Sequence, residues 1–273
     1  MPVKNYDVMM KNNNCSEPTV SVKVLSRYKR QEQEHLYMKK IGIIGAMEVE
    51  VAALKSAMKV SRMLNKAQME FLEGELEGCQ AVVVRSGIGK VNAAVCTQIL
   101  VDEFGVDGVI NTGIAGSLKA EINIGDIVLS TDVLHHDMDA TGFGYDLGQI
   151  PQMNVFSFEA DEKMRTIAKE VCEAVNPEIQ VFEGRIVSGD QFISNREVKD
   201  RIKNNFDGYC TEMEGAAIAQ TAYLNRIPFV IIRAISDKAD DSATMDYPTF
   251  EKQAVEHSVR LTRGFLKRIQ KES

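Results

Sequence analysis

The sequence predicts a single-domain α/β protein, built as three α/β/α layers around a central mixed, mostly parallel sheet. From residue 38 onward, short apolar segments alternate with segments of helical periodicity, which is typical of strands joined by helices. Residues 229–235 are apolar apart from Arg233, as a strand covered on both faces requires. No repeat or linker interrupts residues 38–273, so we expect one domain there.

Each element follows from its pattern: a run of apolar or β-branched residues predicts a strand, and apolar residues three or four apart predict a helix. In the first half we expect a strand at 40–45, a helix at 47–58, strands at 69–76 and 81–85 joined by a turn at 77–80, a helix at 91–104, and strands at 108–111 and 126–133. In the second half we expect a helix at 161–174, a strand at 181–187, a helix at 194–205, a short strand at 209–211, a helix at 213–224, a strand at 229–235 and a last helix at 249–269. Ser194 and Glu197 have the spacing of a capping box, which would start the helix at 194–205.

Composition excludes several classes of function. The net charge of −7 argues against a nucleic-acid partner and against attachment to anionic membranes, because both need a positive field. Five cysteines without a C-x-x-C pair, and only four histidines, predict neither a disulfide framework nor a zinc site. No apolar run reaches the roughly 18 residues of a membrane span, and the N-terminus lacks an apolar signal core. We therefore expect a cytoplasmic protein that acts on small molecules.

Residues 1–37 differ in character from the rest of the chain. They include three consecutive asparagines at 12–14 and show little apolar periodicity. We interpret them as a loosely ordered N-terminal extension. The alternation at 20–25 leaves a short strand open as an alternative.

Six loops follow the expected strands, and in such sheets ligands gather at the carboxyl ends of the strands. In the loop at 45–50, Met47 and Glu50 share a helix face, although a glutamate there also simply favours the helix dipole. The loop at 86–91 resembles a phosphate loop but has Val91 where Ser or Thr is needed, which leaves a tight turn whose amides approach a ligand. The small residues at 111–116 suit either a ligand against the backbone or close loop packing.

The remaining three loops supply an aromatic ring and carboxylates. Phe192, in the loop at 188–193, suits stacking on a flat heterocycle or ordinary core packing. In the loop at 212–217 two glutamates flank a methionine, and we expect one of the two to be structural. Asp237 ends the most apolar strand, where burial would raise its pKa and allow it to act as an acid; an N-cap is the alternative. Together the loops favour acid/base chemistry on a small, flat-ringed substrate without a metal.

These loops also carry a resemblance. GIIGAMEVE, SGIGKVNAA, NTGIAG, GDIV, HHDMDATGFGYDLGQIP, IVSGDQFI, TEMEGAAIA and FVIIRAISDKAD occur in this order. Over about residues 38–270 the sequence is similar to the 5′-methylthioadenosine/S-adenosylhomocysteine nucleosidases of the nucleoside phosphorylase superfamily. The resemblance implies a nucleoside phosphorylase-like fold and a hydrolase that cleaves the N-glycosidic bond of both nucleosides, and of 5′-deoxyadenosine, to release adenine without metal or cofactor.

The same resemblance implies roles for individual residues. Glu50 would activate the attacking water, and Asp237 would protonate N7 of adenine. Glu214 would hold the ribose hydroxyls. The other residues implied in the substrate site are Met213 against the sugar; Phe192 and Ile193 around adenine; Met47, Ile88 and Tyr247 along the ribose and thio-substituent; Arg233 and Ser236 beside the acid/base groups; and Ala115, Gly116 and Glu212. Family members are homodimers, and the segment that the partner chain donates to the pocket matches Ala140, Phe143, Tyr145 and Pro151.

One position departs from the family, and alternatives stay open. Ile114 stands where the family commonly has serine, which puts the polarity around Asp237 in question. A phosphorylase would need arginines or a phosphate nest in the first two loops, and residues 45–50 and 86–92 contain no arginine. A binding module without activity should have lost a carboxylate, yet Glu50, Glu214 and Asp237 are present. An aminodeoxyfutalosine-type nucleosidase would use the same residues.

Overall fold

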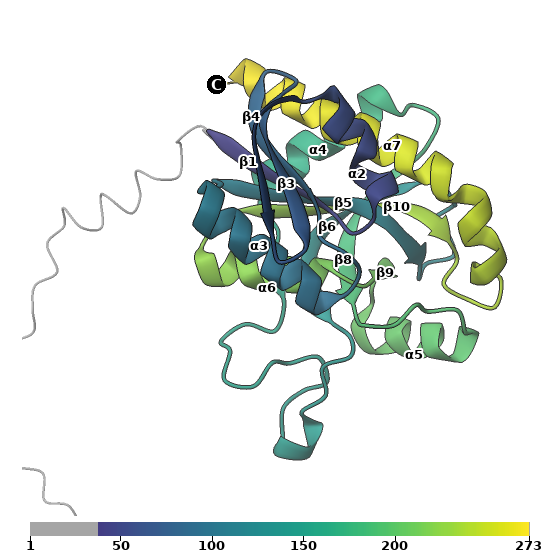
Figure 1. The fold of residues 1–273 in the computed structure, drawn as a ribbon. Coiled ribbons are helices and arrows are strands. Elements are labelled where there is room, and N and C mark those ends of the chain that lie inside the picture. Colours follow the sequence, from purple (N-terminus) through teal and green to yellow (C-terminus); the bar gives the residue numbers. More distant parts are fainter. Residues whose placement is uncertain (1–37, 273) are drawn as a thin grey trace, which may run out of the picture. The chain divides into compact units, whose positions relative to one another are not determined.

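The computed structural model describes residues 38–272 (Figure 1). The proposed extension at 1–37, and the alternative strand at 20–25 within it, lie outside the described residues. No helix in the described part of the chain has the length and apolarity to cross a bilayer.

The described residues form one mixed sheet of ten strands. The strands are β1 (Lys40–Gly45), β2 (Lys59–Lys66), β3 (Met69–Leu76), β4 (Cys79–Arg85), β5 (Gly108–Ser117), β6 (Ile127–His135), β7 (Phe158–Glu159), β8 (Val181–Ser188), β9 (Cys210–Glu212) and β10 (Phe229–Asp237). Their order is β10-β6-β8-β9-β5-β1-β4-β3-β2, with β7 beside β6, and β10 also pairs with β5. That extra pairing closes β5, β10, β6, β8 and β9 into a ring, from which the other strands extend.

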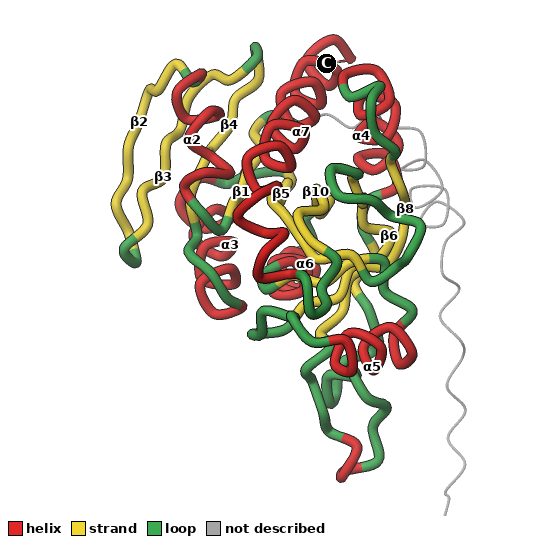
Figure 2. Tube along the Cα trace, turned by 90° about the vertical axis from the view of Figure 1, so that its right-hand side faces the viewer, coloured by secondary structure: helices red, strands yellow, loops and turns green. Residues whose placement is uncertain are grey.

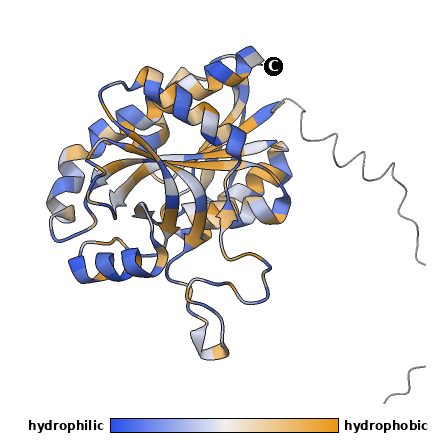
Figure 3. Ribbon diagram, turned by 180° about the vertical axis from the view of Figure 1, so that it is seen from behind, coloured by the Kyte–Doolittle hydropathy of each residue, from blue (hydrophilic) through white to orange (hydrophobic). Residues whose placement is uncertain are grey.

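Helices cover both faces of the sheet, as a sheet with fully buried strands requires. They are α2 (Glu48–Ala57), α3 (Lys90–Phe104), α4 (Glu162–Val175), α5 (Arg196–Phe206), α6 (Gly215–Asn225) and α7 (Ala243–Glu272). The helices α2, α4 and α7 pack together on one face, and α3 packs on α6 on the other (Figure 2). Apolar residues concentrate in the strands and on the inner faces of these helices (Figure 3). The predicted three-layer fold is confirmed.

Most predicted elements lie within a few residues of their observed bounds, and the exceptions have physical reasons. The strand β2 was not predicted, because nearly all its residues are exposed and it has no apolar pattern. The strand β5 runs to Ser117 instead of residue 111, through a segment that contains Gly113, Ala115 and Gly116, residue types with low strand propensity. The predicted capping box of α5 is wrong, because Asn195 rather than Ser194 accepts the Val198 N–H, at 3.1 Å.

A long connection between β6 and β7 leaves the body of the domain. Residues 136–157 form this arm, which extends below the sheet in Figure 1 and carries a single 3-10 turn, Thr141–Phe143. The arm contains the four residues that the resemblance assigns to the partner's pocket.

Candidate active site

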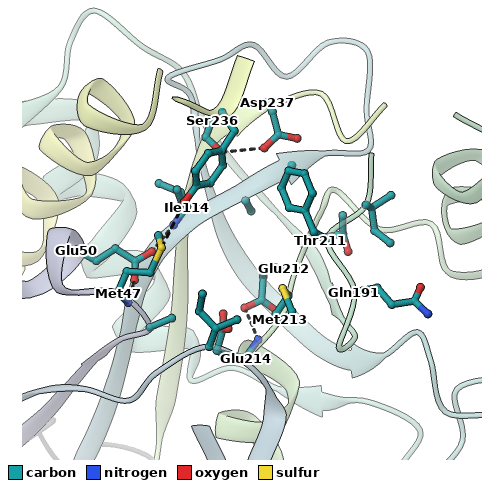
Figure 4. A pocket seen from close by; sticks show the side chains of 17 residues that line it. Met47, Glu50, Ile114, Gln191, Thr211, Glu212, Met213, Glu214, Ser236 and Asp237 are labelled. Carbon is teal, nitrogen blue, oxygen red and sulfur yellow. Dashed lines mark hydrogen bonds between the residues drawn. The ribbon is translucent and has the colours of Figure 1, made fainter. Parts of the chain in front are cut away.

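A cavity of about 460 Å³ opens at the carboxyl ends of the strands (Figure 4). Thirteen of the residues assigned from the sequence line it: Met47, Glu50, Ile88, Ala115, Gly116, Phe192, Ile193, Glu212, Met213, Glu214, Ser236, Asp237 and Tyr247. The remaining lining residues are Ala46, Ile114, Gln191 and Thr211. Arg233, also assigned from the sequence, does not line the cavity. The structure therefore gathers residues from six loops around one space.

Glu50 is held by two backbone amides. It lies at the start of α2, and its carboxylate accepts the Met47 N–H at 2.9 Å and the Ile114 N–H at 3.2 Å. Burial raises the pKa of Glu50, and the nearby Arg233 charge and the amide bonds oppose that rise only in part. A carboxyl with a raised pKa is a stronger base than an ordinary glutamate, so Glu50 is suited to activate water.

Asp237 ends β10 and is buried on the opposite side of the cavity in Figure 4. It accepts the Ala239 N–H at 2.7 Å and the Ser236 hydroxyl at 2.9 Å. Burial raises the pKa of Asp237, and these two bonds lower it by less. The predicted rise is confirmed, and it favours a protonated carboxyl that can act as an acid. Both polar partners come from its own segment, so Ile114 supplies none of them.

Two glycines of β5 leave room for these carboxylates. A Cβ added at Gly113 would lie 2.6 Å from Glu50 Oε1, and one added at Gly116 would lie 2.7 Å from Asp237 Oδ1. Both contacts are closer than carbon and oxygen tolerate, so the bare backbone of β5 is required at both ends of the site.

Arg233 lies behind the cavity as a fully buried cation. Its guanidinium bonds Glu212 and Asn111 and lies 3.9 Å from Glu214. Burial alone would lower the pKa of Arg233, but the carboxylates around it raise the pKa instead. Arg233 therefore holds acidic groups in place without access to the substrate space.

The two glutamates around Met213 have different environments. Glu212 bonds Arg233 and Ser188 and accepts the Gly215 N–H at 2.7 Å; burial would raise its pKa, but Arg233 and these bonds hold the pKa below its usual value. Glu214 ends its strand-to-helix turn and accepts the Gly89 N–H at 2.9 Å. Burial, together with the charge of Glu212, raises the pKa of Glu214 to about 8. Glu212 is thus the structural member of the pair, and Glu214 has an oxygen left for a ligand.

Aromatic and apolar side chains form the mouth of the cavity. Phe192 is half exposed and meets the edge of Tyr247, with ring centroids 5.9 Å apart. The Tyr247 hydroxyl contacts Met47 Sδ at 3.3 Å and donates to Glu251 at 2.9 Å. Phe192 is therefore not a core residue, and a flat ring could lie against it.

The four residues assigned to the partner's pocket lie on the arm. Ala140, just before the 3-10 turn, is buried, whereas Phe143 within the turn is 88% exposed. Tyr145 and Pro151 are partly exposed. None of the four is among the residues that line the cavity of the same chain.

Ala46, Gln191 and Thr211 were missed from the sequence as lining residues. Gln191 precedes Phe192, and Thr211 precedes Glu212, so both belonged to motifs already singled out. Strand alternation puts Thr211 on the opposite face of the sheet from Glu212, so the pattern alone gave no reason to assign both residues to one site. The signal that connects Thr211 to the cavity is its pairing with Gly116 of β5. Among residues 38–272, no three His, Cys, Asp or Glu side chains are grouped to hold a metal ion.

Comparison with known proteins identifies the class of this fold and site. The model of the phosphorylase superfamily matches residues 40–267, and the chain belongs to this superfamily. Solved structures similar to the chain include a nucleosidase from Colwellia psychrerythraea 34H in complex with adenine (TM-score 0.82, 39% identity, 86% of this chain and 98% of that chain). A futalosine hydrolase of Helicobacter pylori has a TM-score of 0.79 and 31% identity, and covers 84% of this chain and 98% of that chain.

The similarity is closer to one group of enzymes in the superfamily. A 5′-methylthioadenosine/S-adenosylhomocysteine nucleosidase from an Exiguobacterium species is 44% identical over 85% of this chain and 99% of its own length. The chain is a member of the 5′-methylthioadenosine/S-adenosylhomocysteine nucleosidases, as its motifs indicated.

Proposed function

We propose that this chain hydrolyses the N-glycosidic bond of 5′-methylthioadenosine and S-adenosylhomocysteine, with Asp237 as the acid and Glu50 as the base. One observation carries the assignment of roles: two buried carboxyls, both with raised pKa, face one cavity from separate walls (Figure 4). The names of its relatives support the substrates.

The two carboxyls meet the two needs of the reaction. Cleavage leaves negative charge on adenine and positive charge on the ribose. A proton from Asp237 to N7 neutralises the adenine, and a water activated by Glu50 attacks the anomeric carbon from the other side. This is the arrangement of an inverting glycosidase applied to a nucleoside.

The remaining lining residues bind the substrate in this proposal. Glu214 accepts hydrogen bonds from the ribose hydroxyls, and Met213 packs against the sugar. Phe192 and the Ile193 backbone receive adenine. The thio-substituent extends along the apolar side chains of Met47, Ile88 and Tyr247.

We further propose that the active form is a homodimer in which each arm completes the partner's site. Large apolar side chains are exposed on the arm and on the neighbouring helices: Phe143 is 88%, Val91 76% and Leu224 63% exposed. Ile88, at the mouth of the cavity, is 52% exposed. A second copy of the chain would cover these side chains and exclude water from the reaction.

The four described cysteines, at 79, 96, 172 and 210, are all free thiols, which fits the cytoplasm.

Two alternatives are separated by one experiment. Phosphorolysis would require an anion site, but no arginine or lysine is among the described residues that line the cavity. A futalosine-type substrate fits the same carboxyls and is the weaker candidate, because the futalosine hydrolase is 31% identical to this chain, whereas the Exiguobacterium nucleosidase is 44% identical.

The experiment measures adenine release from 5′-methylthioadenosine with and without phosphate and identifies the sugar by mass. We expect free methylthioribose at a rate independent of phosphate. A sugar 1-phosphate formed only with phosphate would contradict the roles of Glu50 and Asp237. Adenine release from aminodeoxyfutalosine alone would move the substrate to the second class.

A further inference from the structure

Three charged residues join the loops around the cavity into a closed ring of hydrogen bonds. Lys90 Nζ contacts both oxygens of Asp137, at 2.6 and 2.7 Å. The Asp190 N–H donates to Asp137 at 3.0 Å, and the Lys90 N–H donates to Asp190 Oδ1 at 2.8 Å. Each member belongs to a different segment: Lys90 begins α3, Asp137 follows β6 and Asp190 follows β8.

The ring stabilises the N-terminus of α3, which lacks a side-chain cap of its own. Its N-cap is Gly89, which offers no side chain; the first turn holds no acidic residue, and its first residue is a lysine. A cation at this end opposes the helix dipole, and the first amides lack partners. Carboxylates from distant loops satisfy them: Glu214 accepts the Gly89 N–H, and Asp190 accepts the Lys90 N–H. Burial alone would raise the pKa of Asp137, but Lys90 and the Asp190 amide hold that pKa below its usual value.

The ring is coupled directly to two parts of the site. Gly89, next to Lys90, donates to the same Glu214 carboxylate that faces the cavity, at 2.9 Å. Its φ of 98° and the 3.2 Å that would separate an added Cβ from Asp190 Oδ1 require glycine there. Phe192 follows Asp190 by two residues and lines the cavity. A shift of the ring therefore moves the amide that orients Glu214 and the loop that carries the aromatic ring.

We infer that Asp190, with Lys90 and Asp137, is a positioning residue that holds Glu214 and Phe192 in the geometry that binds the nucleoside. The ring differs from an ordinary surface ion pair, because the side chains of Lys90 and Asp137 are each only 21% exposed and two backbone amides take part in it. Asp137 also begins the arm, so the same ring fixes the base of the segment proposed to reach the partner's site. The inference rests on the proposed function.

The test compares Asp190→Ala with a matched variant at another helix start. Asp161→Ala removes the carboxylate that caps α4, which accepts the Met164 N–H at the same 2.8 Å but lies outside the lining of the cavity. We expect Asp190→Ala to lower kcat/KM for 5′-methylthioadenosine about 10-fold, since a misplaced binding group is costly even when the substituted residue makes no contact with substrate. We expect Asp161→Ala to change kcat/KM by less than about 2-fold, because it destabilises only the helix.

Two further measurements separate positioning from a general loss of structure. Asp190→Asn keeps an oxygen for the Lys90 N–H and should retain most of the activity. The loss in Asp190→Ala should be about 5-fold smaller with the 2′,3′-dideoxy analogue, which offers Glu214 no hydroxyl. Lys90→Met should act in the same direction, whereas Lys169→Met, which breaks an ion pair to Glu183 of similar length (2.7 Å), should not.

The inference is overturned if Asp190→Ala and Asp161→Ala lose the same activity, or if the loss is equal for the substrate and its dideoxy analogue. Hydrogen exchange of residues 86–92 supplies a readout that does not need turnover. We expect faster exchange there in Asp190→Ala than in the wild type, and unchanged exchange would also refute the ring. If the wild-type protein cleaves no nucleoside, but residues 86–92 still exchange faster in Asp190→Ala than in the wild type, the proposed function is refuted and the inference about the ring is not.

Discussion

Replacing Glu214 by glutamine should stabilise the protein, increasingly so as the pH rises. The pKa of Glu214 is raised from 4.5 to about 8 by burial and by the Glu212 charge. Between these pH values the folded protein keeps a proton that the unfolded chain has released. The free energy of unfolding therefore falls as the pH rises through this window, and the loss is complete above pH 8. At about 1.4 kcal/mol per pKa unit, the full difference has a ceiling of about 5 kcal/mol.

Glutamine removes this titration and keeps the oxygen that accepts the Gly89 N–H. We expect the stability difference between Glu214→Gln and the wild type to grow by about 3 kcal/mol from pH 5 to pH 8. For a domain of this size, the difference in Tm between the variant and the wild type therefore grows by about 6–12 °C from pH 5 to pH 8. Thermal unfolding followed by circular dichroism in the absence of ligand measures it, with Glu256→Gln, exposed on α7, as the control. A difference that stays constant with pH would refute the assigned protonation of Glu214.

Four further predictions follow from the site and its surroundings. Asp237→Asn and Glu50→Gln should each lower kcat by about 10²- to 10⁴-fold while adenine still binds by calorimetry; near-normal turnover in either would exclude its role. Removal of residues 1–37 should leave kcat/KM and Tm unchanged, and an inactive product would place the extension in the fold or site. Phe143→Asp should weaken self-association at least about 10-fold in analytical ultracentrifugation, because it puts a charge on the exposed apolar tip of the arm, whereas an unchanged oligomer would remove the arm from the interface. Ile114→Ser should alter kcat by no more than about 3-fold, because Asp237 takes its hydrogen bonds from Ser236 and Ala239; a larger gain would mean that a hydroxyl at 114 reaches the acid.

Local patterns in the sequence were sufficient for the elements that carry the site. The apolar run of β10 and the turn after β1 place Asp237 and Glu50 at strand ends, and the sheet rule brings them to one edge. The raised pKa of Asp237 followed from the same run, because a strand buried on both faces ends in a dry environment.

Pairings between distant strands were not predictable in this way. The ring of strands depends on β10 meeting both β5 and β6, and nothing in the local pattern of β10 specifies two partners. The position of Arg233 behind the cavity depends on the same pairings, because its guanidinium is directed by Asn111 of β5 and Glu212 of β9. The cap of α5 was misassigned, because Ser194 and Asn195 are adjacent and both are able to cap.

The clearance that β5 gives to both carboxyls restricts which residues this strand can carry beside them. Gly113 and Gly116 are three residues apart, which is roughly 10 Å along a strand. One central strand thus passes beside both carboxyls, although α2 carries Glu50 and β10 carries Asp237. Substitutions that repack α2 would move Glu50 relative to Asp237, because Glu50 belongs to that helix. The sequence of β5 is therefore constrained at these two positions by the neighbouring carboxyls themselves, and not by contact with a substrate.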